Sequence, residues 1–71
     1  MLRSLIQTLT PREFQVLRLV SEQMTNDEIA AELYVSPHTI HTHIAVILHK
    51  LRVPKRRNAA NLFRQEIARN G

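Results

Sequence analysis

The clearest hydrophobic pattern in this chain lies between residues 37 and 52. Apolar side chains recur there at the three- and four-residue spacing of one helical face, at Ile40, Ile44, Ile47, Leu48 and Leu51. Polar or small side chains fall on the opposite side of the same segment, at His38, His41, Thr42, Ala45 and His49. Because side chains three and four positions apart share a face of a helix, the pattern predicts a helix with one buried face and one free face.

Start and stop signals stand at both ends of this segment. Ser36 is a favoured N-cap residue, and Pro37 suits the first helical position, where its missing N–H is not needed. Pro54 cannot continue a helix, so we expect this one to end at about residue 52. The preceding segment, 27–34, has the spacing of a second helix, and a tight break between two such helices is typical of a helix-turn-helix.

Two further helices complete the expected fold. Thr10 and Glu13 have the spacing of a capping box around Pro11, which predicts a helix start. Either Thr25 or Asn26 caps the second helix. We therefore expect an all-α fold, a four-helix bundle that contains a helix-turn-helix, with helices over 11–23, 27–34, 37–52 and 58–69.

The rest of the apolar pattern defines the expected core and the domain boundary. The helices other than 37–52 present apolar surface at Phe14, Val16, Leu17, Leu19, Val20, Ile29, Ala30, Leu33, Ala59, Ala60, Leu62, Phe63, Ile67 and Ala68. Residues 1–8 form a lead-in without a clear period, and residues 9–71 form one domain. From the lead-in, Leu2, Leu5 and Ile6, followed by Leu9, are expected to lay apolar contacts along the first helix.

The distribution of charge adds a partner class. The chain of 71 residues has ten Lys and Arg, six Asp and Glu, and a formal net charge of +4. Five of the acids precede residue 36, whereas residues 50–71 carry seven cations and only Glu66. Such asymmetry indicates either a face that meets a polyanion or a solvated basic tail.

Composition and spacing also exclude several classes of function. The chain has no cysteine and no apolar run long enough to cross a bilayer, so we expect a cytoplasmic protein. A zinc site at His38 and His41 is not expected, because no nearby thiolate or carboxylate completes its ligand set. The hydroxyls near the histidines point around the helix and not into a shared pocket, so we expect no enzyme activity and no cofactor.

Together these residues resemble a known family, the LuxR/GerE-type DNA-binding domain of bacterial transcription regulators. The resemblance covers residues 9–68 and keeps its spacing throughout. It is carried by Leu9-Thr10-Pro11-Arg12-Glu13, Val16-Leu17, Thr25-Asn26-Asp27-Glu28-Ile29-Ala30, Leu33-Tyr34-Val35-Ser36, Thr39-Ile40-His41-Thr42-His43, Ile47, Lys50-Leu51, Val53 and Ala59-Ala60.

The resemblance implies a role for each helix. It implies that the third helix enters the major groove of DNA with His41, Thr42 and Ala45 toward the bases. It implies that the second helix and the loops hold phosphates, that Lys50 matches the family's lysine near the end of the third helix, and that Arg56 matches its basic loop residue. It implies that the fourth helix supports the fold and mediates dimerisation, for which the candidates are Leu62, Phe63, Glu66 and Ile67.

The chain departs from the family at four positions. His41 stands where relatives carry Lys or Arg, and Ala45 where they often carry a polar or basic residue. Gln23 replaces a usual glycine, and Arg57 a usual Ser or Thr. As a result, residues 36–49 contain no permanent charge, and guanine reading by Arg or Lys is not available from this stretch.

Candidate DNA contacts therefore divide into three groups. His38, His41 and His49 project outward and are candidates for phosphate or base edges, whereas His43 is expected to be a packed, hydrogen-bonded residue at the core edge. Ser36 and Thr39 have structural roles in the first turn, yet the helix N-terminus they occupy also suits a phosphate. The expected phosphate clamp of the third helix and the next loop consists of Lys50, Lys55, Arg56 and Arg57.

Two functions remain open at this point. The first is sequence-specific binding of double-stranded DNA by a dimeric transcription regulator, possessing an upstream sensor or receiver domain as relatives usually do. The second is a protein–protein interaction module that keeps the fold but has lost DNA specificity, a reading favoured by the uncharged third helix. Under the first hypothesis, Lys50→Ala is expected to weaken binding to all sequences alike.

Overall fold

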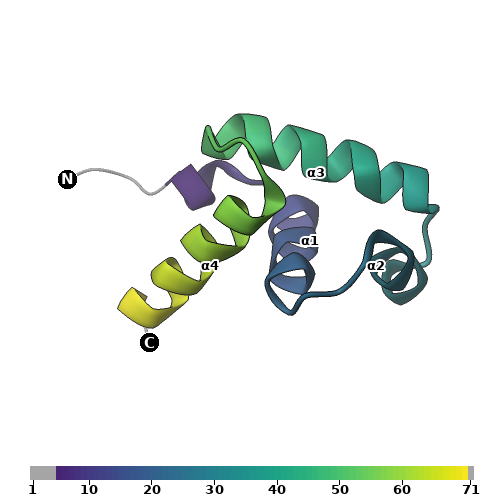
Figure 1. The fold of residues 1–71 in the computed structure, drawn as a ribbon, viewed down its shortest axis with the longest axis horizontal. Coiled ribbons are helices and arrows are strands. Elements are labelled where there is room, and N and C mark those ends of the chain that lie inside the picture. Colours follow the sequence, from purple (N-terminus) through teal and green to yellow (C-terminus); the bar gives the residue numbers. More distant parts are fainter. Residues whose placement is uncertain (1–4, 71) are drawn as a thin grey trace.

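The computed structural model describes residues 5–70, and for Asn70 it describes the backbone alone. The fold is all-α, as predicted (Figure 1). Leu2 and Gly71 lie outside the described residues. A short 3-10 helix, η1, precedes four α-helices, and within the described range there is no strand. The elements are η1 Leu5–Thr8, α1 Pro11–Ser21, α2 Asn26–Leu33, α3 Pro37–Leu51 and α4 Arg56–Asn70.

Side-chain caps fix where the first three α-helices begin. At α1 the Thr10 hydroxyl accepts from the Glu13 N–H at 3.1 Å, and the Glu13 carboxylate accepts from the Thr10 N–H at 2.9 Å. Thr25 and Glu28 repeat this reciprocal box at α2, so Thr25, not Asn26, is the cap. Ser36 caps α3, as predicted. These caps satisfy N–H groups that have no partner within their helices.

The same three helices end in one backbone motif. Gln23, Tyr34 and Arg52 follow α1, α2 and α3 with φ of 64°, 60° and 59°. In each case the next residue donates its N–H to the carbonyl five positions back, as Met24 does to Leu19 and Val35 does to Ala30. This is the Schellman arrangement, which glycine favours because it has no Cβ. The chain's one glycine is Gly71, so all three turns form without it.

Helix α4 begins earlier than the sequence indicated. The prediction placed Arg56 and Arg57 in a loop before a helix at residue 58, but α4 starts at Arg56. The Lys55 carbonyl already accepts from the N–H groups of Asn58 and Ala59, at 3.0 and 3.2 Å. Both arginines therefore lie in the first turn of a helix, where their backbones are fixed.

The core gathers around α3, which contacts η1, α1, α2 and α4. Its buried side chains are Ile40, Ile44, Ile47 and Leu51, with Leu48 partly buried beside them, which confirms the predicted stripe. The other elements contribute Ile6, Val16, Leu17, Leu19, Val20, Ile29, Ala30, Leu33, Ala59, Ala60 and Phe63. A single apolar cluster therefore holds all five elements together.

Three expectations about the apolar residues need correction. Ile6 is buried, but η1 packs mainly against α3 and α4 rather than along the first helix, so Ile6 joins the core of the domain. Phe14 is 38% exposed, because its ring lies at the edge of the core against Phe63, with centroids 5.3 Å apart. Ile67 is 49% exposed, because it lies beyond the part of α4 that the core covers.

We predict that Gln23→Gly stabilises the domain. Removing the Cβ relieves the left-handed backbone at φ 64°, while the added freedom of glycine in the unfolded chain offsets part of the gain. The expected net increase in the free energy of unfolding is about 0.5 kcal/mol, measured by urea denaturation. Gln23→Ala is the matched control, since it keeps the Cβ; an equal increase in that variant would contradict the backbone explanation.

Candidate nucleic-acid interface

One long side of α3 is free of the rest of the described chain. His38, His41, Thr42, Ala45 and His49, the residues that the spacing placed outward, are all exposed. Val46, which the sequence interpretation did not select, is 39% exposed beside them. In Figure 1 this helix runs along one edge of the domain, with the other helices on one side of it. The free side of α3 therefore forms a continuous, uncharged ridge.

The hydroxyl groups near this ridge are already engaged. Ser36 Oγ accepts from the Thr39 N–H at 3.1 Å and lies 2.9 Å from Thr39 Oγ1. Thr42 Oγ1 donates to the His38 carbonyl at 3.2 Å. The bond from the Thr39 N–H confirms the expected cap role of Ser36. Ser36 and Thr42 are exposed, and Thr39 is half-buried. Each oxygen keeps acceptor capacity for another group.

His43 differs from the other three histidines. It is half-buried at the flank of the apolar stripe, as expected. Its side chain makes no hydrogen bond within residues 5–70, so the expected hydrogen bond is absent there. The exposed imidazoles of α3 are thus those of His38, His41 and His49.

Lys50 turns away from the ridge and pairs with Glu13. Its Nζ donates to Glu13 Oε1 at 2.7 Å, and the Glu13 side chain is only 11% exposed. The same oxygen accepts from the Thr10 N–H in the capping box. Burial raises the pKa of Glu13, but the hydrogen bonds from Lys50 and Thr10 and the attraction of the Lys50 charge outweigh it, so the pKa lies below its ordinary value. One carboxylate thus joins the start of α1 to the end of α3.

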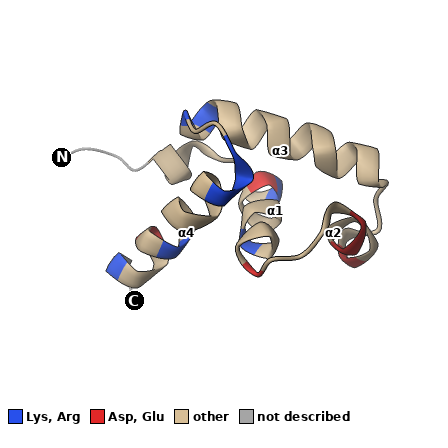
Figure 2. Cartoon of the chain, viewed as in Figure 1, with Lys and Arg blue, Asp and Glu red and all other residues tan. Residues whose placement is uncertain are grey.

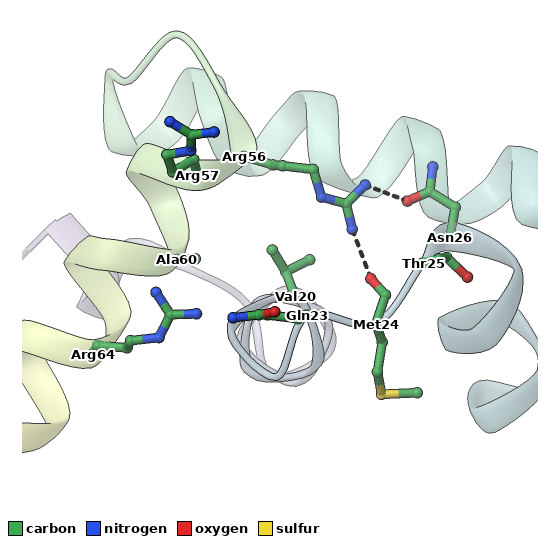
Figure 3. Close-up of a pocket in the computed structure, with 9 residues that line it drawn as sticks. All are labelled: Val20, Gln23, Met24, Thr25, Asn26, Arg56, Arg57, Ala60 and Arg64. Atoms are coloured by element: carbon green, nitrogen blue, oxygen red, sulfur yellow. Dashed lines mark hydrogen bonds between the residues drawn. The ribbon is translucent and has the colours of Figure 1, made fainter.

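Arg56 has a similar building role at the other end of the loop. It donates to Asn26 Oδ1 at 2.7 Å and to the Met24 carbonyl at 3.0 Å, which joins the start of α4 to the start of α2 (Figure 3). Arg64 donates to the Ser21 carbonyl at 2.7 Å, near the end of α1. These contacts surround an open pocket of about 580 Å³, which Arg57 also lines. The resemblance gave no sign of these internal contacts.

The cations left free for a partner near the end of α3 are therefore a different set. Arg52, Lys55 and Arg57 are exposed. Arg52, at the end of α3, was not among the predicted contacts. Figure 2 shows Lys and Arg concentrated at the end of α3, the following loop and α4, while Asp and Glu lie mainly on α1 and α2. The predicted separation of charge is thus present in space.

The candidate dimer residues on α4 do not form one exposed surface. Leu62 and Glu66 are half-buried, and Ile67 is 49% exposed. Phe63 is only 6% exposed and packs on Phe14. Phe63 therefore belongs to the core of a single copy, and the free apolar surface of this set comes mainly from Ile67.

Two further classes of feature are absent from the described residues. Within residues 5–70 no three or more His, Asp and Glu side chains gather in a way that could hold a metal ion. None of the described helices has both the length and the apolar character that crossing a membrane requires.

Comparison with known proteins gives the family. The profile described as "Bacterial regulatory proteins, luxR family" matches residues 7–63. The chain is 46% identical over 54 residues to the transcriptional regulatory protein LiaR of Bacillus subtilis, covering 76% of this chain and 26% of LiaR. It is 41% identical over 58 residues to the nitrate/nitrite response regulator protein homolog of Haemophilus influenzae, covering 82% of this chain and 28% of that protein.

A third relative is much longer. The HTH-type transcriptional regulator MalT of Serratia proteamaculans is 46% identical over 57 residues, which cover 80% of this chain and 6% of MalT. The chain thus spans about a quarter, or much less, of the length of these relatives.

The Glu13–Lys50 pair predicts a pH-dependent stability. Because the folded state lowers the pKa of Glu13, its contribution is present above the ordinary carboxyl range and is lost as the pH falls through the lowered value. Glu13→Gln keeps the capping box, since Gln also serves at that position, but it removes the charge. Urea denaturation should show a loss of about 1 kcal/mol near pH 6 that shrinks toward pH 3. A loss of equal size at both pH values would contradict the ion-pair explanation.

Proposed function

This chain belongs to the luxR family of bacterial regulatory proteins, as one of its DNA-binding domains, and we propose that it binds double-stranded DNA sequence-specifically with α3 in the major groove. The observation that carries this proposal is the free ridge of α3, since its opposite face is buried in the core. Because the match is to a family of regulatory proteins, we propose no enzyme activity for this domain.

The dimensions of α3 fit this role. Its 15 residues span roughly 22 Å at the ordinary helical rise. A major groove about 12 Å wide admits one such helix. The ridge residues His41, Thr42 and Ala45 would then face base edges, with His38 and His49 nearer the two ends.

The phosphate contacts that we propose differ in part from the resemblance. Arg52, Lys55 and Arg57 are free and lie near the end of α3, where they can meet the DNA backbone. Lys50 and Arg56 act mainly as positioning residues, because Glu13 and Asn26 already hold them. Ser36 and Thr39 add the N-terminal end of α3, whose N–H groups favour an anion.

We also propose the assembly in which the domain works. Ile67, Leu62 and Glu66 on α4 support a homodimer that places two copies of α3 on a two-fold related site. The relatives' greater length supports a further sensor or receiver domain in the whole protein. Such a protein would act in the cytoplasm, where bacterial DNA lies.

Salt dependence tests the proposal and its choice of cations. Affinity for a random-sequence duplex should fall linearly with the logarithm of salt concentration, because each phosphate contact releases counterions. Lys55→Gln and Arg57→Gln should each flatten the slope by about one unit. Lys50→Met should change it much less, since Glu13 balances that charge. Fluorescence anisotropy titration at four salt concentrations measures all four proteins.

The same titration also examines the second function. If no duplex binds even at low salt, DNA binding fails and the interaction module becomes the better explanation of the uncharged ridge. If Lys50→Met flattens the slope as much as Lys55→Gln, the DNA displaces Glu13 from Lys50, and the positioning role assigned to Lys50 is wrong. Circular dichroism of each variant shows that the fold is retained.

The histidines of the ridge are expected to contact the DNA. At fixed salt, His41→Gln should therefore weaken binding to a selected duplex, and the triple variant His38→Gln, His41→Gln, His49→Gln should weaken it further, as measured by fluorescence anisotropy. Unchanged affinity in the triple variant would show that the imidazoles do not approach DNA.

A further inference from the structure

The centre of the α3 ridge carries methyl groups between its histidines. Thr42 lies three positions before Ala45 and four before Val46, so the three side chains share one patch of the helix surface. We call this surface the methyl patch. All three are exposed, and Val46 is 39% exposed. His38 and His49 flank this patch along the helix.

Thr42 belongs to this patch through its methyl group. Its hydroxyl donates to the His38 carbonyl at 3.2 Å, so the O–H points back along the helix backbone. The γ-methyl occupies another staggered position on the same Cβ and does not point to that carbonyl. With its proton engaged, Thr42 offers DNA a methyl group and an accepting oxygen, but no free donor.

The ridge lacks the groups that read guanine. Residues 36–49 contain no Lys or Arg, and Lys50 is held by Glu13 at 2.7 Å. Only thymine presents a methyl group in the major groove, and Ala and the Thr methyl are side chains that contact it. The exposed apolar carbon atoms of the methyl patch are therefore complementary to one feature of a base pair, the methyl group of thymine.

We propose that the methyl patch selects thymine, so that the bound half-site carries thymines opposite Thr42, Ala45 and Val46. This inference rests on the proposed function, because it requires α3 in the major groove. It assigns Val46 a role in specificity. The uncharged surface of α3 then contributes to recognition itself. Specificity then comes from removing methyl groups from water, while the free cations at the end of α3 supply affinity for any duplex.

The experiment compares thymine with uracil, which lacks only the methyl group. A duplex is first selected from a random library with the unaltered domain, and each thymine of its half-sites is then replaced singly by uracil. Burial of one methyl group predicts about a fourfold loss of affinity at each contacted thymine. Thymines outside the bound region serve as the internal control and should show no loss.

Two matched variants assign the effect to Thr42. Thr42→Ser removes the methyl and keeps the hydroxyl. The ratio of the affinity for the thymine duplex to the affinity for the uracil duplex should therefore fall from about four to about one at a single position. Thr42→Val keeps a methyl and removes the hydroxyl, so that ratio should remain. Val46→Thr replaces one methyl by a hydroxyl of similar shape and should lower the ratio at a different thymine.

The outcomes separate this inference from the proposed function. If the domain binds a selected duplex but no uracil substitution weakens it, thymine selection is wrong and DNA binding stands. A selected half-site without thymine has the same meaning. If Thr42→Ser keeps the thymine preference and Thr42→Val loses it, the hydroxyl and not the methyl is the contact, which also overturns the inference. If no duplex binds at all, both proposals fail together.

Discussion

The structure depends on the division of α3 into two faces. One stripe of this helix packs against all the other elements, so the core and the order of the helices are organised by Ile40, Ile44, Ile47 and Leu51. Because that stripe lies on one side of α3, its burial alone leaves the other side exposed. Burial thus both stabilises the domain and orients its ridge, and a rotation of α3 would expose apolar surface and bury imidazoles at a high cost.

The long-range polar contacts of Lys50 and Arg56 complete this arrangement. The Glu13 carboxylate joins the start of α1 to the end of α3 through Lys50, and Arg56 joins the start of α4 to the loop before α2. Both contacts lie near helix ends, where backbone groups lack partners within the helix. They also withdraw two cations from any phosphate clamp. A basic residue close to a DNA-binding helix is therefore not by itself a DNA contact, because its charge can already be balanced inside the domain.

Much of the fold followed from local features of the sequence. The apolar spacing of residues 37–52 and the caps at Thr10 and Ser36 act over three or four residues, so the helices and the free side of α3 were predictable. The contacts of Lys50 and Arg56 were not, because their partners lie 37 and 30 residues away. The exposure of Val46 also depends on how neighbouring helices pack. The DNA contacts themselves remain predictions from residue type and position.

The absence of charge on the ridge changes how affinity and specificity are related. In a recognition helix with lysines, one side chain can attract phosphates and read a base, so both properties depend on salt. Here the free cations near the ridge, Arg52, Lys55 and Arg57, lie at the end of α3 and beyond it, while the ridge offers methyl groups and imidazoles. Methyl contacts depend little on salt, because they arise from the removal of apolar surface from water. The ratio between specific and random binding should therefore be nearly independent of salt at constant pH, even as both affinities fall.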